Sequence, residues 1–268
     1  MKKLALRTAL LAAPLLAAWL WCSAASAAVI NATFDSNYTA ERQACAQAAI
    51  DQWENTLLNS YTFDHVRMLI MDLSFIGNPL AATNISTGGY QPQFAAETLS
   101  TGSAGTGGGD QFGPVFPVIP WDSNTYITVA LNSNYVGQMY FGVSGPVPGG
   151  QYDVLTLFRH ELGHGVGFAE EYTAFAAKLT PGPGSDRTYN GNGFTVEITP
   201  AGQGTHVLDS DDLMSPTLGT GVRQDISSDP DLRVLSDAYG YVTPEPATLA
   251  LMAVGFVAGL VARRRRAA

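Results

Sequence analysis

Two histidines and a glutamate stand at a spacing that can build a metal site. His160, Glu161 and His164 form the pattern H-E-x-x-H within residues 156–168. Residues four apart lie on the same face of a helix, so both imidazole rings can reach one zinc ion while Glu161 sits beside the open side of the metal. A catalytic zinc usually takes three protein ligands and leaves a fourth position to water. The pattern therefore predicts a zinc hydrolase whose third ligand lies elsewhere in the chain.

The residues around this pattern favour a helix. Asp153 can cap its start, and Gly165 and Gly167 can end it. The apolar residues recur near the 3.6-residue period of a helix. They are Val154, Leu155, Leu157, Phe158, Leu162 and Val166.

The third ligand can be sought among the remaining histidines. The chain has four, of which only His65 and His206 lie outside the predicted helix. His65 begins a predicted strand far upstream and is most simply a surface residue. His206 lies in a downstream loop shortly before Met214. We therefore expect His206 to be the third ligand.

The order of these residues resembles the metzincin zinc proteases. His160-Glu161-x-x-His164-x-x-Gly167 is followed by Leu-Met-Ser-Pro at residues 213–216. The short metzincin pattern has its third histidine three residues after the glycine, where this chain has Glu170. Leishmanolysin-like metzincins instead have Gly-Phe at this point, an inserted segment, and the third histidine a little before the Met-turn. This chain is similar to that second arrangement.

The resemblance implies a role for each matching residue. Glu170 stays open as an alternative third ligand, because zinc accepts carboxylates and Glu170 occupies the short-pattern position. The implied roles are zinc ligands for His160, His164 and His206, general base for Glu161, the tight turn for Gly167 and the Met-turn for Met214.

Three aspartates precede the methionine. Asp209, Asp211 and Asp212 are most simply solvated turn residues. A Ca²⁺ site is the alternative, although the regular spacing of a calcium loop is lacking.

The first residues have the three regions of a secretory signal. Lys2, Lys3 and Arg7 precede an apolar run at residues 10–21, and small residues follow. We expect a signal peptide at residues 1–27. Its removal would take Cys22 and leave Cys45 as the only cysteine, so no internal disulfide could form. Cys45 is expected in the buried face of a helix; inhibition of zinc by its thiol is the alternative.

The last residues resemble a PEP-CTERM sorting signal. Pro244-Glu245-Pro246 is followed by an apolar run at residues 247–262 and by four arginines at 263–266. The run is short for a membrane span, which usually needs about 20 residues. The resemblance implies a transient transmembrane helix at the inner membrane of a Gram-negative bacterium, processing by an exosortase, and release to the surface or extracellular matrix. An ordinary C-terminal anchor is the alternative.

The charge balance excludes one class of partner. The chain carries 14 basic and 23 acidic residues. Both terminal segments together hold 7 of the basic residues and one of the acidic ones, which leaves 7 basic and 22 acidic residues and a net charge of about −15. Because nucleic acids are bound by basic patches, we expect no nucleic-acid partner.

The remaining pattern predicts one α+β domain at residues 28–242, with an α/β-like opening and a sorting segment at 243–268. We expect strands at residues 28–34, 64–75 and 125–131 and a hairpin at 189–198. We expect a long helix at 40–58, a short helix at 170–179 and a final helix from Asp229 to Gly240. A flexible glycine-rich loop is expected at 100–109. The resemblance implies a metzincin-like zincin with a twisted mixed sheet and the strand at 125–131 as the edge that pairs with an extended substrate.

These features together suggest a secreted zinc endopeptidase acting on proteins or peptides. Glu161 would take a proton from a water made acidic by zinc as hydroxide attacks a peptide carbonyl. Two alternatives stay open. One is a catalytically inactive zincin-fold protein that binds at the surface or in a biofilm matrix; the other is a secreted carbohydrate-binding domain.

Overall fold

A computed structural model describes residues 27–57, 62–86, 97–99, 126–182, 186–200, 205–226 and 229–241. Within them the chain is a mixed α and β protein, as the sequence predicts. The helices are α2 (Ala40–Thr56), α3 (Val154–Gly165), α4 (Thr173–Ala176) and α5 (Asp229–Tyr239), with 3₁₀ turns at Ser74–Ile76 and Ser133–Gln138. Residues 1–26 of the leader predicted at 1–27, the glycine-rich loop at 100–109 and the tail at 243–268 lie outside the described residues.

Three sheets form within the described residues. The first is five-stranded, in the order β1 (Val29–Phe34), β2 (Thr62–Met71), β5 (Tyr126–Asn132), β3 (Ala81–Ser86) and β4 (Glu97–Leu99). The second joins β10 (Phe194–Ile198), β9 (Arg187–Gly191) and β8 (Leu179–Pro181), and the third pairs β6 (Met139–Tyr140) with β7 (Tyr152–Asp153).

The opening strand, helix and strand form as predicted. β1 and β2 pair in parallel, and α2 connects them. The hydroxyl of Thr39 accepts a hydrogen bond from the backbone N–H of Arg42, which caps α2. The burial predicted for Cys45 is confirmed, and Ala49 and Trp53 on the same helix are fully buried as well. β2 begins at Thr62 and ends at Met71, earlier at both ends than predicted, because a 3₁₀ turn follows it.

β5 lies in the middle of the five-stranded sheet. It pairs in parallel with β2 on one side and antiparallel with β3 on the other. The expectation that this strand is the edge for an extended substrate is therefore wrong. The physical reason is that Ile127–Asn132 are buried on both faces of the sheet, as is usual for a central strand.

β3 and β4 were not predicted from the sequence. β3 reads Ala-Ala-Thr-Asn-Ile-Ser, in which Thr83 and Asn84 break the apolar pattern. Both side chains are nevertheless buried. Pairing with β5 over six residues supplies the backbone hydrogen bonds that local propensity does not signal.

The later elements follow the prediction in part. The hairpin is confirmed, with β9 and β10 antiparallel around a turn at residues 192–193. The helix expected at 170–179 is reduced to Thr173–Ala176, and Leu179 already belongs to β8. The final helix is confirmed as Asp229–Tyr239 and is followed by Gly240, whose φ is +69°.

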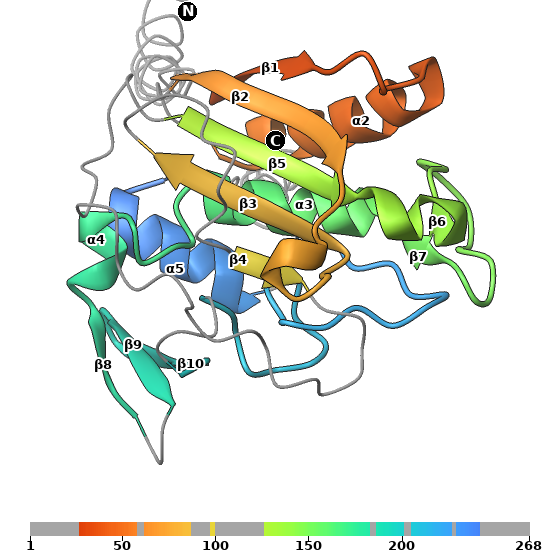
Figure 1. The fold of residues 1–268 in the computed structure, drawn as a ribbon. Helices are drawn as coiled ribbons and strands as arrows, with labels where there is room; N and C mark the ends of the chain where they lie inside the picture. The colour runs from red at the N-terminus through yellow and green to blue at the C-terminus, as the bar shows by residue number, and fades with distance from the viewer. Residues whose placement is uncertain are drawn as a thin grey trace, which may run out of the picture.

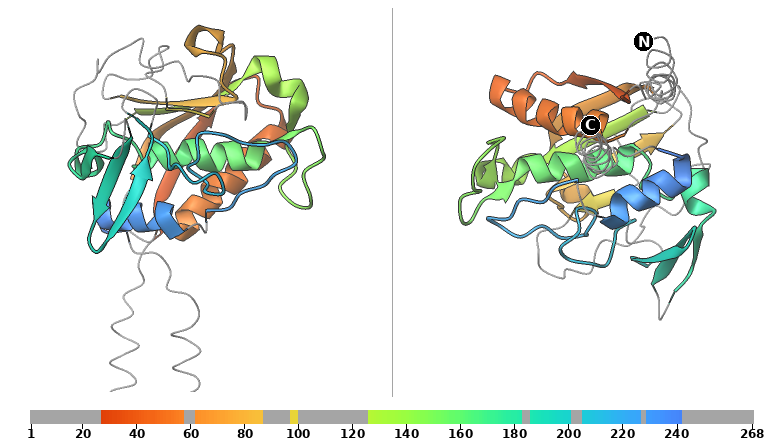
Figure 2. Two further views of the ribbon diagram at one scale, coloured as in Figure 1. Left: turned by 90° about the horizontal axis from the view of Figure 1, so that it is seen from below. Right: turned by 180° about the vertical axis from the view of Figure 1, so that it is seen from behind.

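The helices α2 and α3 cover one face of the five-stranded sheet (Figure 1). Viewed from below, α5 lies beyond α3 on the side away from this sheet, and the β8–β10 sheet closes one end (Figure 2). No helix in the described ranges is long and apolar enough to cross a membrane, and the apolar run at 247–262 is not among them.

Candidate metal centre

α3 brings the first two histidines together in its C-terminal half. The Asp153 carboxylate accepts hydrogen bonds from the backbone N–H and the hydroxyl of Thr156 and so fixes the start of the helix. His160 and His164 are both completely buried, and their Nε2 atoms lie 3.0 Å apart. The helical spacing thus places both rings on one face, as the sequence predicts.

His206 completes a cluster of three histidines. Its ring centroid lies 5.3 Å from that of His160 and 5.1 Å from that of His164. Each of the three offers a ring nitrogen, and these atoms all lie within 4.8 Å of one another. Among the described residues this is the one group of three or more His, Cys, Asp or Glu side chains close enough to share an ion.

The segment after β10 positions His206. Its backbone N–H donates to the Thr199 hydroxyl, and its carbonyl accepts from the Thr199 N–H. The next residue, Val207, pairs with Ile198 and donates its N–H to the carbonyl of Met214. His206 is therefore fixed by a short antiparallel ladder and not by a free loop.

Backbone carbonyls orient both helical histidines. The Nδ1 atom of His160 lies 2.7 Å from the carbonyl oxygen of Leu213, and that of His164 lies 2.8 Å from the carbonyl oxygen of Phe168. A carbonyl only accepts, so we assign the proton of each ring to Nδ1. Each Nε2 then presents a lone pair to the cluster, which is the arrangement of a metal-binding histidine with a fixed tautomer.

The donor set fits a zinc ion. Two lone pairs 3.0 Å apart repel each other unless a cation lies between them. A tetrahedral zinc with Zn–N bonds of about 2.0–2.1 Å separates two nitrogen ligands by roughly 3.3 Å. Burial lowers the pKa of His160 to about 4 and that of His164 well below its ordinary value, so both rings are neutral at physiological pH, as metal binding requires.

Glu161 is completely buried on the same helix. Its Oε2 atom accepts a hydrogen bond of 2.7 Å from the Thr83 hydroxyl on β3. Its Oε1 atom is buried without a hydrogen-bond partner among the described residues. Burial raises the pKa of this carboxyl group to about 8, against the opposing effect of the Thr83 hydrogen bond. A nearby cation would favour the ionised form.

Met214 packs directly beneath α3. It is fully buried, and a Cβ added at Gly163 would stand 2.6 Å from its sulfur and 3.2 Å from Cζ2 of Trp53. Gly163 lies between the two helical histidines, so the absence of a side chain there lets the turn at Met214 approach the helix. The sequence singled out Met214 but not Gly163.

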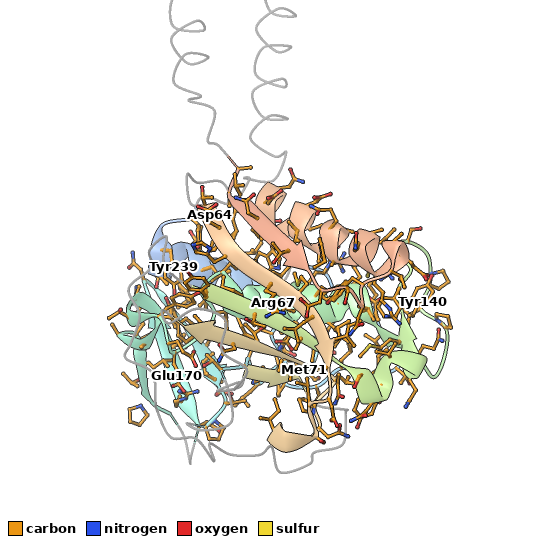
Figure 3. All side chains as sticks on the ribbon, turned by 45° about the horizontal axis from the view of Figure 1, so that its top comes forward. Asp64, Arg67, Met71, Tyr140, Glu170 and Tyr239 are labelled. Carbon is orange, nitrogen blue, oxygen red and sulfur yellow. The ribbon has the colours of Figure 1, made fainter. Side chains whose placement is uncertain are left out.

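Glu170, the alternative third ligand, lies away from the histidines. It forms an ion pair with Arg187, and its side chain is 37% exposed. Figure 3 shows it at the end of the molecule formed by the β8–β10 sheet. Arg187 also donates to the carbonyl of Thr199. Through Arg187, Glu170 therefore supports the segment before His206 from outside the histidine cluster.

The other candidate residues have structural partners. The His65 ring stacks on Tyr126 at 4.4 Å. Asp209 and Asp212 accept backbone N–H groups within the turn before Met214, as expected for turn residues. Burial raises the pKa of the Cys45 thiol to about 12, and Cys45 packs into the core from the buried face of α2.

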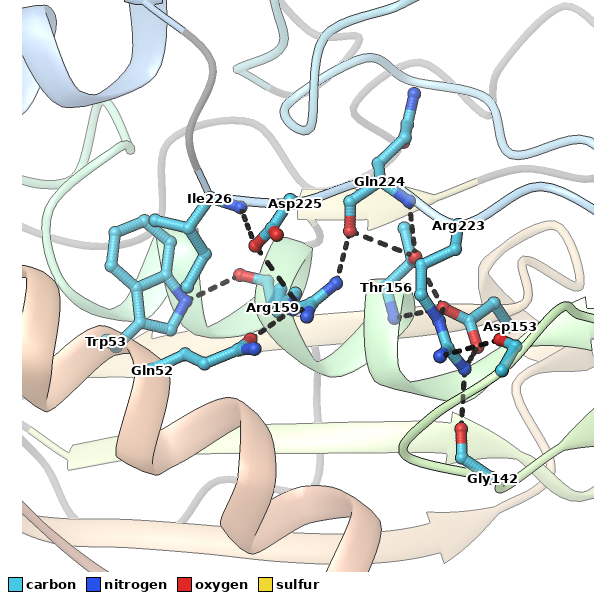
Figure 4. Close-up of polar contacts among 11 residues, drawn as sticks. Gln52, Trp53, Gly142, Asp153, Thr156, Arg159, Arg223, Gln224, Asp225 and Ile226 are labelled. Atoms are coloured by element: carbon cyan, nitrogen blue, oxygen red, sulfur yellow. Dashed lines mark hydrogen bonds and ion pairs between the residues drawn. The ribbon is translucent and has the colours of Figure 1, made fainter.

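A polar network anchors the first half of α3 and was not predicted (Figure 4). Arg159 donates to the side chain of Gln52 and the carbonyl of Gln224, and its own carbonyl accepts from the Trp53 indole. Arg223 pairs with Asp153. A charged residue inside an apolar helix stripe, such as Arg159, is the sequence signal that could have shown this network.

Comparison with known proteins identifies one segment of the chain. The family model of the PEP-CTERM protein-sorting motif matches residues 242–266. The chain carries a PEP-CTERM sorting signal. This signal marks an exported protein of a Gram-negative bacterium that is processed by exosortase and located at the surface or outside the cell. No curated protein and no solved structure matches the chain.

Proposed function

We propose that this exported protein is a zinc-dependent endopeptidase. The observation that carries the proposal is the buried cluster of His160, His164 and His206, in which two rings have a fixed tautomer and the ring nitrogens lie within 4.8 Å of one another. A structural zinc site usually has four protein ligands, whereas three histidines beside a carboxylate leave room for water. This donor set therefore favours catalysis over a purely structural ion.

The surrounding fold supports a metzincin-like assignment. Parallel β1 and β2 are joined by the long helix α2, and an antiparallel β3 lies beside the helix that carries H-E-x-x-H. His206 and the turn at Met214 then follow on the far side of the helix. This order supports the resemblance to the leishmanolysin-like arrangement on which the proposal draws.

The three histidines would hold the ion, and the fixed tautomers of His160 and His164 would direct their Nε2 lone pairs toward it. Bound there, zinc would supply Lewis acidity and make water a nucleophile near neutral pH. Glu161 Oε1 is the oxygen left to take a proton from that water, because Oε2 is already bonded to Thr83. The same carboxyl group can then return the proton to the leaving amine of a peptide.

The test is a paired measurement on the full-length protein. We expect about one zinc per chain by elemental analysis and cleavage of denatured casein that stops when a chelator removes the metal. Glu161→Gln should keep the zinc but lose at least about 100-fold in cleavage rate, since general base catalysis contributes about 10²–10⁴-fold.

The two readouts separate the alternatives. Zinc binding without cleavage of any peptide substrate would indicate a binding protein that keeps the zinc fold. Wild-type protein without stoichiometric metal would remove the proposal and favour a binding domain of another kind. Full cleavage by Glu161→Gln would remove Glu161 as the base.

A further inference from the structure

The carbonyl groups at the end of α3 are all satisfied, but by unusual partners. A helix leaves its last four carbonyls without partners inside the helix. Here the carbonyls of Leu162, Gly163 and His164 accept backbone N–H groups from residues 166–168. The carbonyl of Phe168 accepts from Nδ1 of His164. The three carbonyls between them, those of Gly165, Val166 and Gly167, accept hydrogen bonds from side chains.

Three tyrosine hydroxyls bind these three consecutive carbonyls. Tyr172 donates to Gly165 at 2.7 Å, Tyr241 to Val166 at 3.0 Å and Tyr239 to Gly167 at 2.7 Å. Tyr172 lies just after the turn, whereas the other two come from the end of α5 and the segment that follows it. Two parts of the chain about 70 residues apart therefore close on one turn.

The tyrosine rings also pack against the turn and one another. Tyr239 stands edge-on to Tyr172 with centroids 6.3 Å apart, and it lies 5.4 Å from Tyr241. Gly167 has a φ of +131°, and a Cβ there would stand 2.4 Å from the Tyr239 ring. Gly167 thus serves both the backbone conformation and the close approach of the ring. Figure 3 shows Tyr239 on the α5 side of the molecule.

We propose that Tyr172, Tyr239 and Tyr241 are positioning residues for His164. They hold the turn that contains the Phe168 carbonyl, and this carbonyl fixes the orientation and tautomer of the His164 ring. Residues that orient a metal ligand from outside the coordination sphere set metal affinity. The effect on zinc rests on the proposed function; the effect on the turn does not.

Tyr241 also lies next to the sorting signal in the sequence. The PEP-CTERM motif begins at residue 242, directly after Tyr241. The segment that joins the domain to its sorting signal therefore also supports the metal centre. Processing on the C-terminal side of Tyr241 preserves this support.

The experiment compares tyrosine-to-phenylalanine variants of the full-length protein. Tyr239→Phe, Tyr241→Phe and the double variant each remove only hydroxyl groups. Tyr189→Phe is the matched control, because its buried hydroxyl binds Asp237 and the Val234 carbonyl on α5 and does not touch the turn. Two properties are measured: zinc affinity by competition with a chromophoric chelator, and amide hydrogen exchange of the metal-free protein in peptides covering residues 163–168.

We expect the double variant to bind zinc at least about 10-fold more weakly, the size typical of lost outer-sphere partners. We also expect its turn to exchange at least about 5-fold faster, since one hydrogen bond contributes about 1 kcal/mol. Exchange in α2 should stay unchanged, which shows that the variant is folded. The control should match the wild type in both properties. Unchanged turn exchange in the double variant, or an equal effect of Tyr189→Phe, would overturn the proposal. Wild-type protein without zinc affinity would remove the proposed function, while the exchange data would still decide the role of the tyrosines.

Discussion

The Nδ1 atom of His160 lies 2.7 Å from the carbonyl oxygen of Leu213, the residue before Met214. Through this contact the middle of α3 is joined to the turn that also pairs with the segment of His206, because Val207 donates to the Met214 carbonyl. One short loop thus orients the first histidine and positions the third. The cluster of three histidines is therefore built by the loop as much as by the helix.

His206 should be required for metal binding, and Glu170 should not. We expect His206→Ala to lose more than about 100-fold in zinc affinity, above the range for lost outer-sphere partners. Glu170→Ala breaks only the ion pair with Arg187 and should change affinity little. His65→Ala is the control, since His65 stacks on Tyr126 outside the cluster. A larger loss in Glu170→Ala than in His206→Ala would reverse the ligand assignment.

The hydroxyl group of Thr83 should be needed for the full rate of peptide cleavage with Glu161 as the base. Thr83→Val keeps the shape of the side chain but removes the donor to Oε2, so we expect kcat for peptide cleavage to fall by about 10-fold with little change in KM. Thr83→Ser keeps a hydroxyl and should restore most of the rate. Elemental analysis should find equal zinc in both variants. If serine fails to restore what valine loses, the hydroxyl is not the active feature.

Gly163 should not tolerate a side chain. Gly163→Ala would place a Cβ 2.6 Å from the Met214 sulfur, and overpacking of this kind costs about 1–3 kcal/mol in the free energy of unfolding. Urea denaturation of the variant should show this loss. Gly137→Ala is the control, because no atom lies within 4 Å of a Cβ at that exposed position. Equal stability of the two variants would contradict the close packing of Met214 on α3.

Cys45 should not react with thiol reagents in the folded protein. Its side chain is fully buried, and burial raises the pKa of its thiol to about 12, so almost no thiolate is present at pH 8. Mass spectrometry of the Cys45 peptide should find no label after treatment with a thiol-specific reagent, and complete labelling after denaturation. Removal of metal with a chelator should leave the result unchanged. Labelling that appears only after chelation would instead indicate that the thiol contacts the metal.

The local parts of this protein follow from short-range patterns in its sequence. A four-residue spacing on a helix forces His160 and His164 onto one face, and Asp153 caps that helix through contacts within a few residues. The first strand, the long helix with Trp53 in its buried face, and the hairpin after Arg187 follow from local patterns in the same way.

The contacts between distant groups depend on how the whole chain folds. The residues of β5 predict a strand from their own pattern, but its place between β2 and β3 depends on partners 40 or more residues away. Thr83 lies in a segment with weak strand propensity and reaches Glu161 only because β3 pairs with β5. The approach of His206 to the two helical histidines, and that of the tyrosines to the end of α3, likewise arise from contacts between segments far apart in the chain, which no local periodicity encodes.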